Sequence, residues 1–171
     1  MEAATNLRVS QVQADWGGEF RNKDLEEELR QHCITSKESV PRHSETNTAI
    51  ERTNRTILTM SRIALIGAEL PRSLWDKASA WATHTKNRVP YKALKGKTPI
   101  KIFLQKNVRK ERTNLRPFGR SVICFNYEVK DKMSSRCYEA RIIGYSSSFG
   151  TYWVRTLEGA VKLAKIQLPY T

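Results

Sequence analysis

Two carboxylates, Asp15 and Glu51, are the side chains of this 171-residue chain that are best suited to carry out chemistry. They are separated by 35 residues, and Glu2 is the only acidic residue before Asp15. Carboxylate oxygens are the ligands that Mg²⁺ prefers, and metal ions held beside a phosphodiester stabilise both the attacking and the leaving oxygen. The pair therefore predicts a divalent-metal site that acts on phosphate esters.

Each carboxylate also has a purely structural interpretation. Asp15 stands before Trp16 and two glycines, where aspartate is common as a turn residue. Glu51 is expected in the first turn of a helix, where the helix dipole favours a negative charge. The residue types alone leave both interpretations open.

The distribution of charge favours an anionic partner. The net charge is +13; residues 52–120 contain 17 lysines and arginines against 3 aspartates and glutamates, whereas residues 1–51 contain 6 and 10. A basic segment beside candidate metal ligands suits a phosphate backbone, bound through release of counterions rather than by reading of bases. Asn54 and Arg55 follow Glu51 by three and four positions, so a helix places all three side chains on the same face. A basic surface that is only solvated is the alternative.

A strand and a helix must position the two carboxylates. Residues 7–14 alternate apolar and polar side chains, which predicts a half-buried strand that ends at Asp15. From about Thr48, apolar residues recur at intervals of three, four and seven up to Gly67, which predicts a helix. Between them we expect a helix over 23–33, a short strand over 34–40 and a polar surface loop over 41–47.

The rest of the chain is expected to contain helices first and strands afterwards. Helices are predicted over 73–88 and 99–105, joined by a linker at 90–97. Four runs of β-branched and aromatic residues separated by turn residues predict a small antiparallel barrel. These runs are residues 121–127, 138–145, 151–156 and 160–168.

One stripe on the helix predicted over 73–88 is expected to pack in the core. It has helical period and no interleaved basic residues, so core packing is favoured over a platform on which bases would stack. The stripe consists of Leu74, Trp75, Ala78, Trp81, Ala82 and Thr85.

Several classes of protein are disfavoured. The three cysteines have no C-x-x-C spacing and the three histidines have no H-x₃₋₅-H spacing, so we expect no disulfide framework and no zinc site, but free and mostly buried thiols. No apolar run reaches 18 residues and no secretory signal is recognisable, so we expect an intracellular protein with no membrane span.

Short motifs along the chain resemble, in the same order, landmarks of copia-type retrotransposon integrases. Any one of them alone is unspecific, but their order and the spacing from Asp15 to Glu51 are specific. They are Asp15-Trp16-Gly17-Gly18-Glu19-Phe20, Asn47, Glu51-Arg52-Thr53-Asn54-Arg55-Thr56, Leu70-Pro71 with Trp75, Asn87-Arg88, Gly96-Lys97-Thr98-Pro99, Leu115-Arg116-Pro117-Phe118-Gly119 and Gly144-Tyr145-Ser146.

The resemblance implies an α+β fold with two domains. Residues 1–105 would form part of an RNase H-like catalytic core of the DD35E class, residues 106–116 a basic linker, and residues 117–171 an SH3-like β domain. The nucleus would be the site of action, DNA (element ends and target) the partner, and a homo-oligomer the expected assembly, with no membrane and no small-molecule substrate involved.

In the family that the chain resembles, two aspartates and one glutamate hold two Mg²⁺ ions, or Mn²⁺, which activate water or a DNA 3′-hydroxyl. By match Asp15 is the second carboxylate and Glu51 the third. Asn47, Arg52, Asn54 and Arg55 would contact nucleic acid.

The chain also departs from the family pattern. Because only 14 residues precede Asp15, we expect the first catalytic aspartate and the amino-terminal zinc module to be absent. Thr48 stands where the family has glycine, and a β-branched residue stiffens the loop. We therefore expect a DDE-type polynucleotidyl transferase segment that binds metal weakly and is inactive alone. A non-catalytic nucleic-acid-binding remnant and a protein-interaction module built on the β domain are the alternatives.

Overall fold

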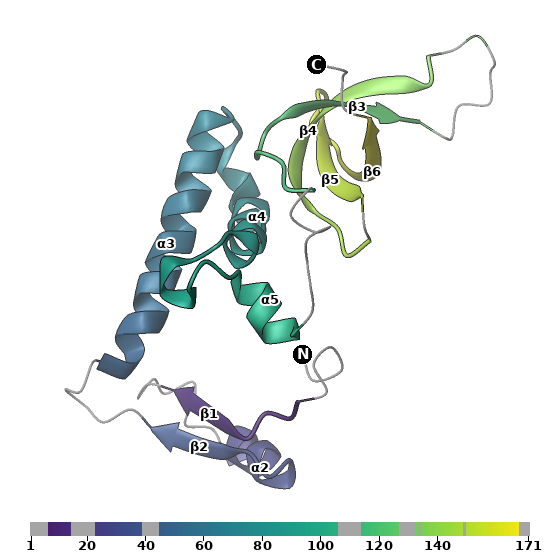
Figure 1. Cartoon of the computed structure of the whole chain (residues 1–171). Coiled ribbons are helices and arrows are strands. Elements are labelled where there is room, and N and C mark those ends of the chain that lie inside the picture. Colours follow the sequence, from purple (N-terminus) through teal and green to yellow (C-terminus); the bar gives the residue numbers. More distant parts are fainter. Residues whose placement is uncertain are drawn as a thin grey trace. The chain divides into compact units, whose positions relative to one another are not determined.

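The computed structural model describes residues 7–14, 23–38, 45–105, 114–126, 133, 135–148 and 150–167. The chain divides into two compact units: Met1–Thr56 with Phe103–Gln105, and Ile57–Ile102 with Lys106–Thr171. Figure 1 labels the helices and strands of both units. Each unit is described by itself.

The first unit contains a small parallel sheet. Strand β1 (Gln11–Ala14) pairs with β2 (Thr35–Glu38), and helix α2 (Lys23–Gln31) lies between them in sequence (Figure 1). Parallel strands need such a crossover because the end of the first strand and the start of the second lie at opposite edges of the sheet. The predicted helix and second strand are present, but the helix ends at Gln31 instead of Cys33 and the strand begins at Thr35 instead of Ile34. The first strand is shorter than the predicted 7–14, because its first four residues are outside the ladder.

Helix α3 (Glu45–Gly67) contributes residues to both units. It begins before the predicted start near Thr48, so the predicted loop over 41–47 is wrong for its last three residues; residues 41–44 lie outside the described ranges. The helix ends at Gly67, as predicted, but Gly67 itself does not take the left-handed conformation. Instead Glu69 takes a left-handed φ of 51°, and the N–H groups of Glu69 and Leu70 donate to the carbonyls of Ile66 and Leu65. These two bonds satisfy carbonyls that a helix end leaves unpaired.

The helices that follow α3 occur in the predicted order, and all but the last two residues of α5 belong to the second unit. They are the 3₁₀ turn η2 (Arg72–Leu74), α4 (Trp75–Arg88), the 3₁₀ turn η3 (Lys92–Leu94) and α5 (Pro99–Leu104). On α4, Ala78 and Ala82 are fully buried as predicted, whereas Trp75 is 64% exposed, so its prediction as a core residue is wrong.

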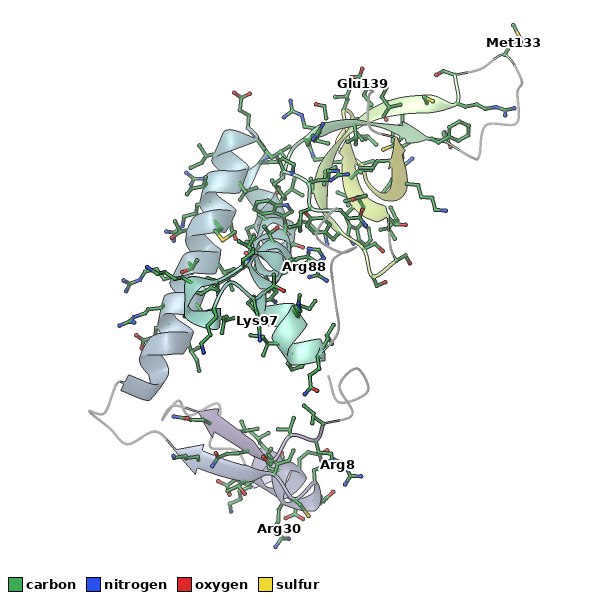
Figure 2. All side chains as sticks on the ribbon, viewed as in Figure 1. Arg8, Arg30, Arg88, Lys97, Met133 and Glu139 are labelled. Atoms are coloured by element: carbon green, nitrogen blue, oxygen red, sulfur yellow. The ribbon has the colours of Figure 1, made fainter. Side chains whose placement is uncertain are left out.

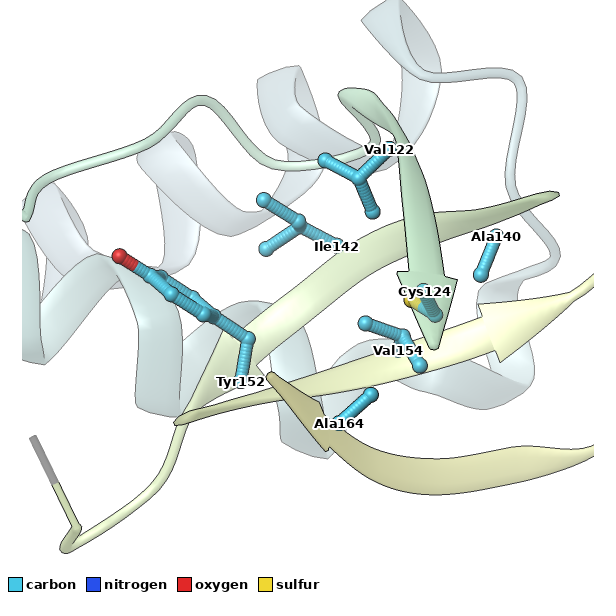
Figure 3. Close-up of a cluster of buried hydrophobic side chains, with 7 residues drawn as sticks. All are labelled: Val122, Cys124, Ala140, Ile142, Tyr152, Val154 and Ala164. Carbon is cyan, nitrogen blue, oxygen red and sulfur yellow. The ribbon is translucent and has the colours of Figure 1, made fainter. Parts of the chain in front are cut away.

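Four strands form a closed antiparallel barrel, as the sequence predicts. They are β3 (Ser121–Phe125), β4 (Cys137–Tyr145), β5 (Thr151–Thr156) and β6 (Val161–Gln167), and β3 pairs with both β4 and β6. Alternate residues of these strands fill the interior, because successive side chains of a strand point to opposite faces. Figure 3 shows this core, which consists of Val122, Cys124, Ala140, Ile142, Tyr152, Val154 and Ala164.

A second hydrophobic cluster joins the barrel to the helices. Ile143 follows Ile142 on β4 and points to the other face, where it packs with Phe118, Leu65, Leu70 and Ala78. The helices and the barrel therefore share one core. The predicted boundary at 106–116 falls inside this unit, and the division into separately folding domains stays a prediction.

Polar contacts reinforce this junction. Trp81 Nε1 donates to the carbonyl oxygen of Arg116 at 3.0 Å, and Arg141 Nη1 donates to the carbonyl oxygen of Ala68 at 2.7 Å. Ala68 follows the last residue of α3, so the guanidinium meets the negative end of the helix dipole.

The three cysteines are free, as predicted, but only Cys124 is buried. Cys33 lies after the end of α2 with a φ of 55°, and Cys137 is the first, outward-facing residue of β4. Both are exposed, so the prediction of mostly buried thiols is wrong for them.

His84 on α4 is expected to make stability depend on pH. Its ring stacks on Tyr145 with centroids 3.9 Å apart, and burial, followed by the positive charge of Arg88, lowers the pKa of His84 from 6.5 to about 4. The unfolded chain then binds a proton at a higher pH than the folded chain. We therefore expect the free energy of unfolding to fall as the pH decreases from about 6.5 to about 4.

Denaturant unfolding at several pH values, on the wild type and on His84→Gln, measures this effect. The glutamine variant should lose the part of the pH dependence that arises in this window. An NMR titration in which the folded His84 ring protonates near 6.5 would contradict the expectation.

Candidate nucleic-acid interface

Glu51 lies deeper in α3 than the sequence predicts. Because the helix begins at Glu45, Glu51 is past the first turn, and its side chain is exposed. The stabilising effect of a helix dipole on a carboxylate is confined to the first turn. The interpretation of Glu51 as a dipole-favoured residue of the first turn therefore loses its basis.

The three other candidates that the structure describes on α3 are also exposed. They are Arg52, Asn54 and Arg55. Residues three and four positions apart are neighbours on a helix, so Asn54 and Arg55 share the face of Glu51. Within the described part of the chain, the Glu51 carboxylate forms no salt bridge. A carboxylate, an amide and a guanidinium are thus presented together to solvent.

The remaining two candidates are Asp15 and Asn47, and the structure describes the side chain of neither. Strand β1 ends at Ala14, so Asp15 directly follows a strand as predicted, but Asp15 itself lies outside the described residues. Asn47 belongs to the first turn of α3, and its side chain is likewise outside the description. How close Asp15 and Glu51 lie stays a prediction.

A metal site is not complete among the described residues. No three His, Cys, Asp or Glu side chains lie together within the described ranges. Glu51 offers hard oxygen donors of the type that Mg²⁺ prefers. The fit of a divalent ion therefore depends on Asp15 joining Glu51.

Exposed basic residues dominate the helical part of the second unit. Asp76 is one of its few acidic residues. A hydrogen bond from the backbone N–H of Lys77, followed by the Lys77 ammonium 3.3 Å away, lowers the pKa of the Asp76 carboxyl. Figure 2 shows Lys97 among these side chains. The exposed basic residues are Arg62, Arg72, Lys92, Lys95, Lys97 and Lys101.

A pocket of about 210 Å³ lies between α4 and the turn from β4 to β5. The sequence indicates only a turn at residues 146–150, because serine and glycine clusters are typical of turns. The hydroxyl groups there become a candidate site only when the fold brings Arg88 beside them. No local signal in the sequence predicts that proximity.

In the described part of the chain, no helix is long and apolar enough to cross a membrane.

The chain is homologous to a region of a retrotransposon Pol polyprotein. The relative is the retrovirus-related Pol polyprotein from transposon TNT 1-94 of Nicotiana tabacum, which is 30% identical over 146 residues, or 85% of this chain. The chain spans only 11% of the length of that relative. No family model matches the chain. The predicted resemblance to a retrotransposon Pol polyprotein is thus confirmed, while the RNase H-like core and its triad stay predictions.

A solved structure gives a weaker likeness. One chain of the cryo-EM structure of the simian T-cell lymphotropic virus intasome in complex with PP2A regulatory subunit B56 gamma aligns with a TM-score of 0.49 and 17% identity. The alignment covers 94% of this chain and 57% of that chain.

Proposed function

We propose that this chain is a DNA-binding segment of a retrotransposon integrase, inactive as an isolated polypeptide. The observation that carries the proposal is the 30% identity to a Pol polyprotein over 85% of the chain. Integrases act on DNA, so the proposal requires a surface that accepts a phosphate backbone. The exposed basic residues Arg52 and Arg55 of α3 supply such a surface.

Helix α3 provides the contact in this proposal. Arg52 and Arg55 neutralise backbone phosphates and release counterions, and Asn54 donates a hydrogen bond. Asn47, at the start of the same helix, lies along the same strand of DNA. Because these contacts are to phosphates, binding does not depend on base sequence.

The catalytic part of the proposal rests on Asp15 and Glu51 as the second and third carboxylates of a triad. They would hold Mg²⁺ or Mn²⁺, which would supply stabilisation of the attacking and leaving oxygens at phosphorus. Two carboxylates leave a second metal ion short of ligands, so binding is weak. We further propose that the sheet and helices belong to an RNase H-like core, that the barrel is an SH3-like domain, and that the chain forms homo-oligomers in the nucleus.

The shared core argues against a barrel that acts alone as a protein-interaction module. Phe118 and Ile143 pack on residues of α3 and α4, including Leu65 and Ala78. Separating the barrel from the helices would expose these side chains to water, at a cost of about 25 cal/mol for each Å² of apolar surface. The helices and the barrel therefore act as one functional piece in this proposal.

A polypeptide of this sequence is expected to bind duplex DNA without cutting or joining it. The logarithm of the affinity should fall linearly with the logarithm of the salt concentration, because each phosphate contact releases counterions. Fluorescence anisotropy at several salt concentrations measures the binding, and a strand-transfer and nicking assay with Mg²⁺ and with Mn²⁺ measures the chemistry.

Two results would contradict the proposal. Affinity that is independent of salt would exclude the backbone contact. Metal-dependent nicking that disappears in Asp15→Asn and in Glu51→Gln, but persists in Glu69→Gln, would show that the isolated chain is active.

A further inference from the structure

The pocket between α4 and the β4–β5 turn has the size of a site for a small group. Its volume is about 210 Å³. Sites for drug-sized ligands measure about 300 to 1,000 Å³. A single phosphate with the atoms next to it is a more suitable occupant than a whole cofactor.

The walls of the pocket offer donors of hydrogen bonds and positive charge. Arg88 contributes a guanidinium, and the turn contributes the hydroxyl groups of Ser146, Ser147, Ser148 and Thr151. None of the described residues that line the pocket is acidic. An anion whose atoms only accept hydrogen bonds is therefore the chemically matching ligand.

The backbone of the turn adds further donors. Ser146 N–H donates to the carbonyl of Thr151, and Ser148 N–H donates to Ser146 Oγ at 3.3 Å, so the turn is held in place from within. No described residue accepts a hydrogen bond from the N–H of Ser147 or Gly150. Backbone N–H groups of a turn are a common element of phosphate sites.

The same bonds that join the barrel to the preceding segment fix the pocket walls. Tyr152 Oη donates to the carbonyl of Asn114 at 2.9 Å, and Tyr145 Oη donates to the carbonyl of Arg116 at 2.9 Å. Arg88 Nη1 donates to the carbonyl of His84 at 3.3 Å, which holds the guanidinium at the pocket. A site that is already ordered loses little entropy when a ligand binds.

Arg116 and His84, both near the pocket, support the preference for an anion. Burial raises the pKa of Tyr152, but the positive charge of Arg116 opposes that rise, so Arg116 acts electrostatically on the pocket wall. Burial, followed by the charge of Arg88, lowers the pKa of His84 to about 4, so its ring is neutral at pH 7; an anion bound beside it would raise that pKa.

We propose that this pocket binds one phosphate group of a nucleic-acid strand, with Arg88 and the serine turn as its ligands. That the phosphate belongs to nucleic acid rests on the proposed function, whereas the preference of the site for a phosphate group follows from the pocket alone. A strand bound here would lie against both α4 and the barrel. The junction of helices and barrel would then be a second point of contact with nucleic acid, separate from Glu51, Arg52 and Arg55 on α3.

The test is an NMR titration of the full chain with the dinucleotide d(TpT) and, separately, with inorganic phosphate. We expect d(TpT) to shift the amide signals of Ser147 and Gly150 saturably and to raise the pKa of His84. Arg88→Gln should weaken binding by about 10-fold, the usual effect of losing a charge-assisted hydrogen bond. Lys86→Gln removes the same charge from the same helix outside the pocket lining and should change binding by less than about 2-fold.

Ser147→Ala/Ser148→Ala keeps the proposal testable if Arg88→Gln does not fold, and should weaken binding by about 3-fold. Absence of a saturable shift with both probes overturns the site. Binding of inorganic phosphate without d(TpT) overturns the nucleic-acid source. If d(TpT) binds here but the affinity for duplex DNA does not depend on salt, the proposed function is contradicted and the phosphate site is supported. If duplex DNA binds with the expected salt dependence but leaves the amide signals of Ser147 and Gly150 unchanged, the phosphate site is contradicted and the proposed function is supported.

Discussion

Replacing Gly119 by alanine should lower the free energy of unfolding by about 3 kcal/mol, of which strain at a positive φ contributes about 1 and steric overlap about 2. Gly119 has a φ of 75°, which L side chains rarely adopt. A Cβ atom there would overlap the Cβ of Ala68, at the end of α3. Because Phe118 beside it is buried in the cluster that joins helices and barrel, the backbone has little room to move. Urea denaturation followed by circular dichroism measures the loss.

Two variants serve as controls for Gly119→Ala. Gly67 is in α3, and a Cβ atom added to it would meet no other atom within 4 Å, so Gly67→Ala should stabilise the protein by about 0.5 to 1 kcal/mol. Ala68→Gly removes the overlapping methyl group, so combining it with Gly119→Ala should recover about 1 to 2 kcal/mol relative to additivity. Strictly additive effects of the two substitutions would show that the overlap is not the cause.

Replacing Arg52 and Arg55 together by alanine should weaken binding to duplex DNA by about 50-fold at 0.1 M salt, and should reduce the salt slope by about 2. Both side chains are exposed on α3, and alanine preserves the helix because it has the highest helix propensity. Loss of affinity would therefore report lost phosphate contacts rather than lost structure. Fluorescence anisotropy with one duplex at several salt concentrations measures both quantities.

The matched control removes the same charge elsewhere in the first unit. Arg30 on α2 is exposed and lies 2.8 Å from Glu27, and Lys37 on β2 is exposed. Arg30→Ala/Lys37→Ala should weaken binding by less than about 5-fold, since only the long-range, screened attraction is lost. Equal losses in the two double variants would mean that net charge, and not the face of α3, determines binding.

Local patterns predicted the elements of this protein well where the period of the side chains was unambiguous. The four strands of the barrel alternate inward and outward residues, as at Val122 and Cys124, and their turns carry serine, glycine and acidic residues. The side-chain pattern places the start of α3 three residues too late, because the polar residues before Thr48 have no apolar period although their backbone is helical. Helix boundaries depend on bonds that the pattern of side chains does not reveal.

The candidate site could be predicted only in part. Residue types and spacing identified Glu51, Arg52, Asn54 and Arg55, and the structure places all four on the surface of α3. Glu51 lies beyond the first turn of α3, where a carboxylate gains little from the helix dipole, so the structure disfavours the purely structural interpretation of Glu51. The pocket beside Arg88 was not predictable, since its walls come from segments about 60 residues apart in the sequence.

The sequence by itself determined the ancestry of this protein, the order of its elements and the closed barrel, because motif order, spacing and side-chain period are properties of the linear chain. Only the tertiary structure decided that Ile143 and Phe118 belong to a core shared with the helices, that Trp75 is exposed, and that Arg88 meets a serine turn. The physical reason is that burial and proximity depend on packing between segments that are distant in the sequence. Local periodicity indicates which face of a helix or strand is buried, but not which other segment packs against that face.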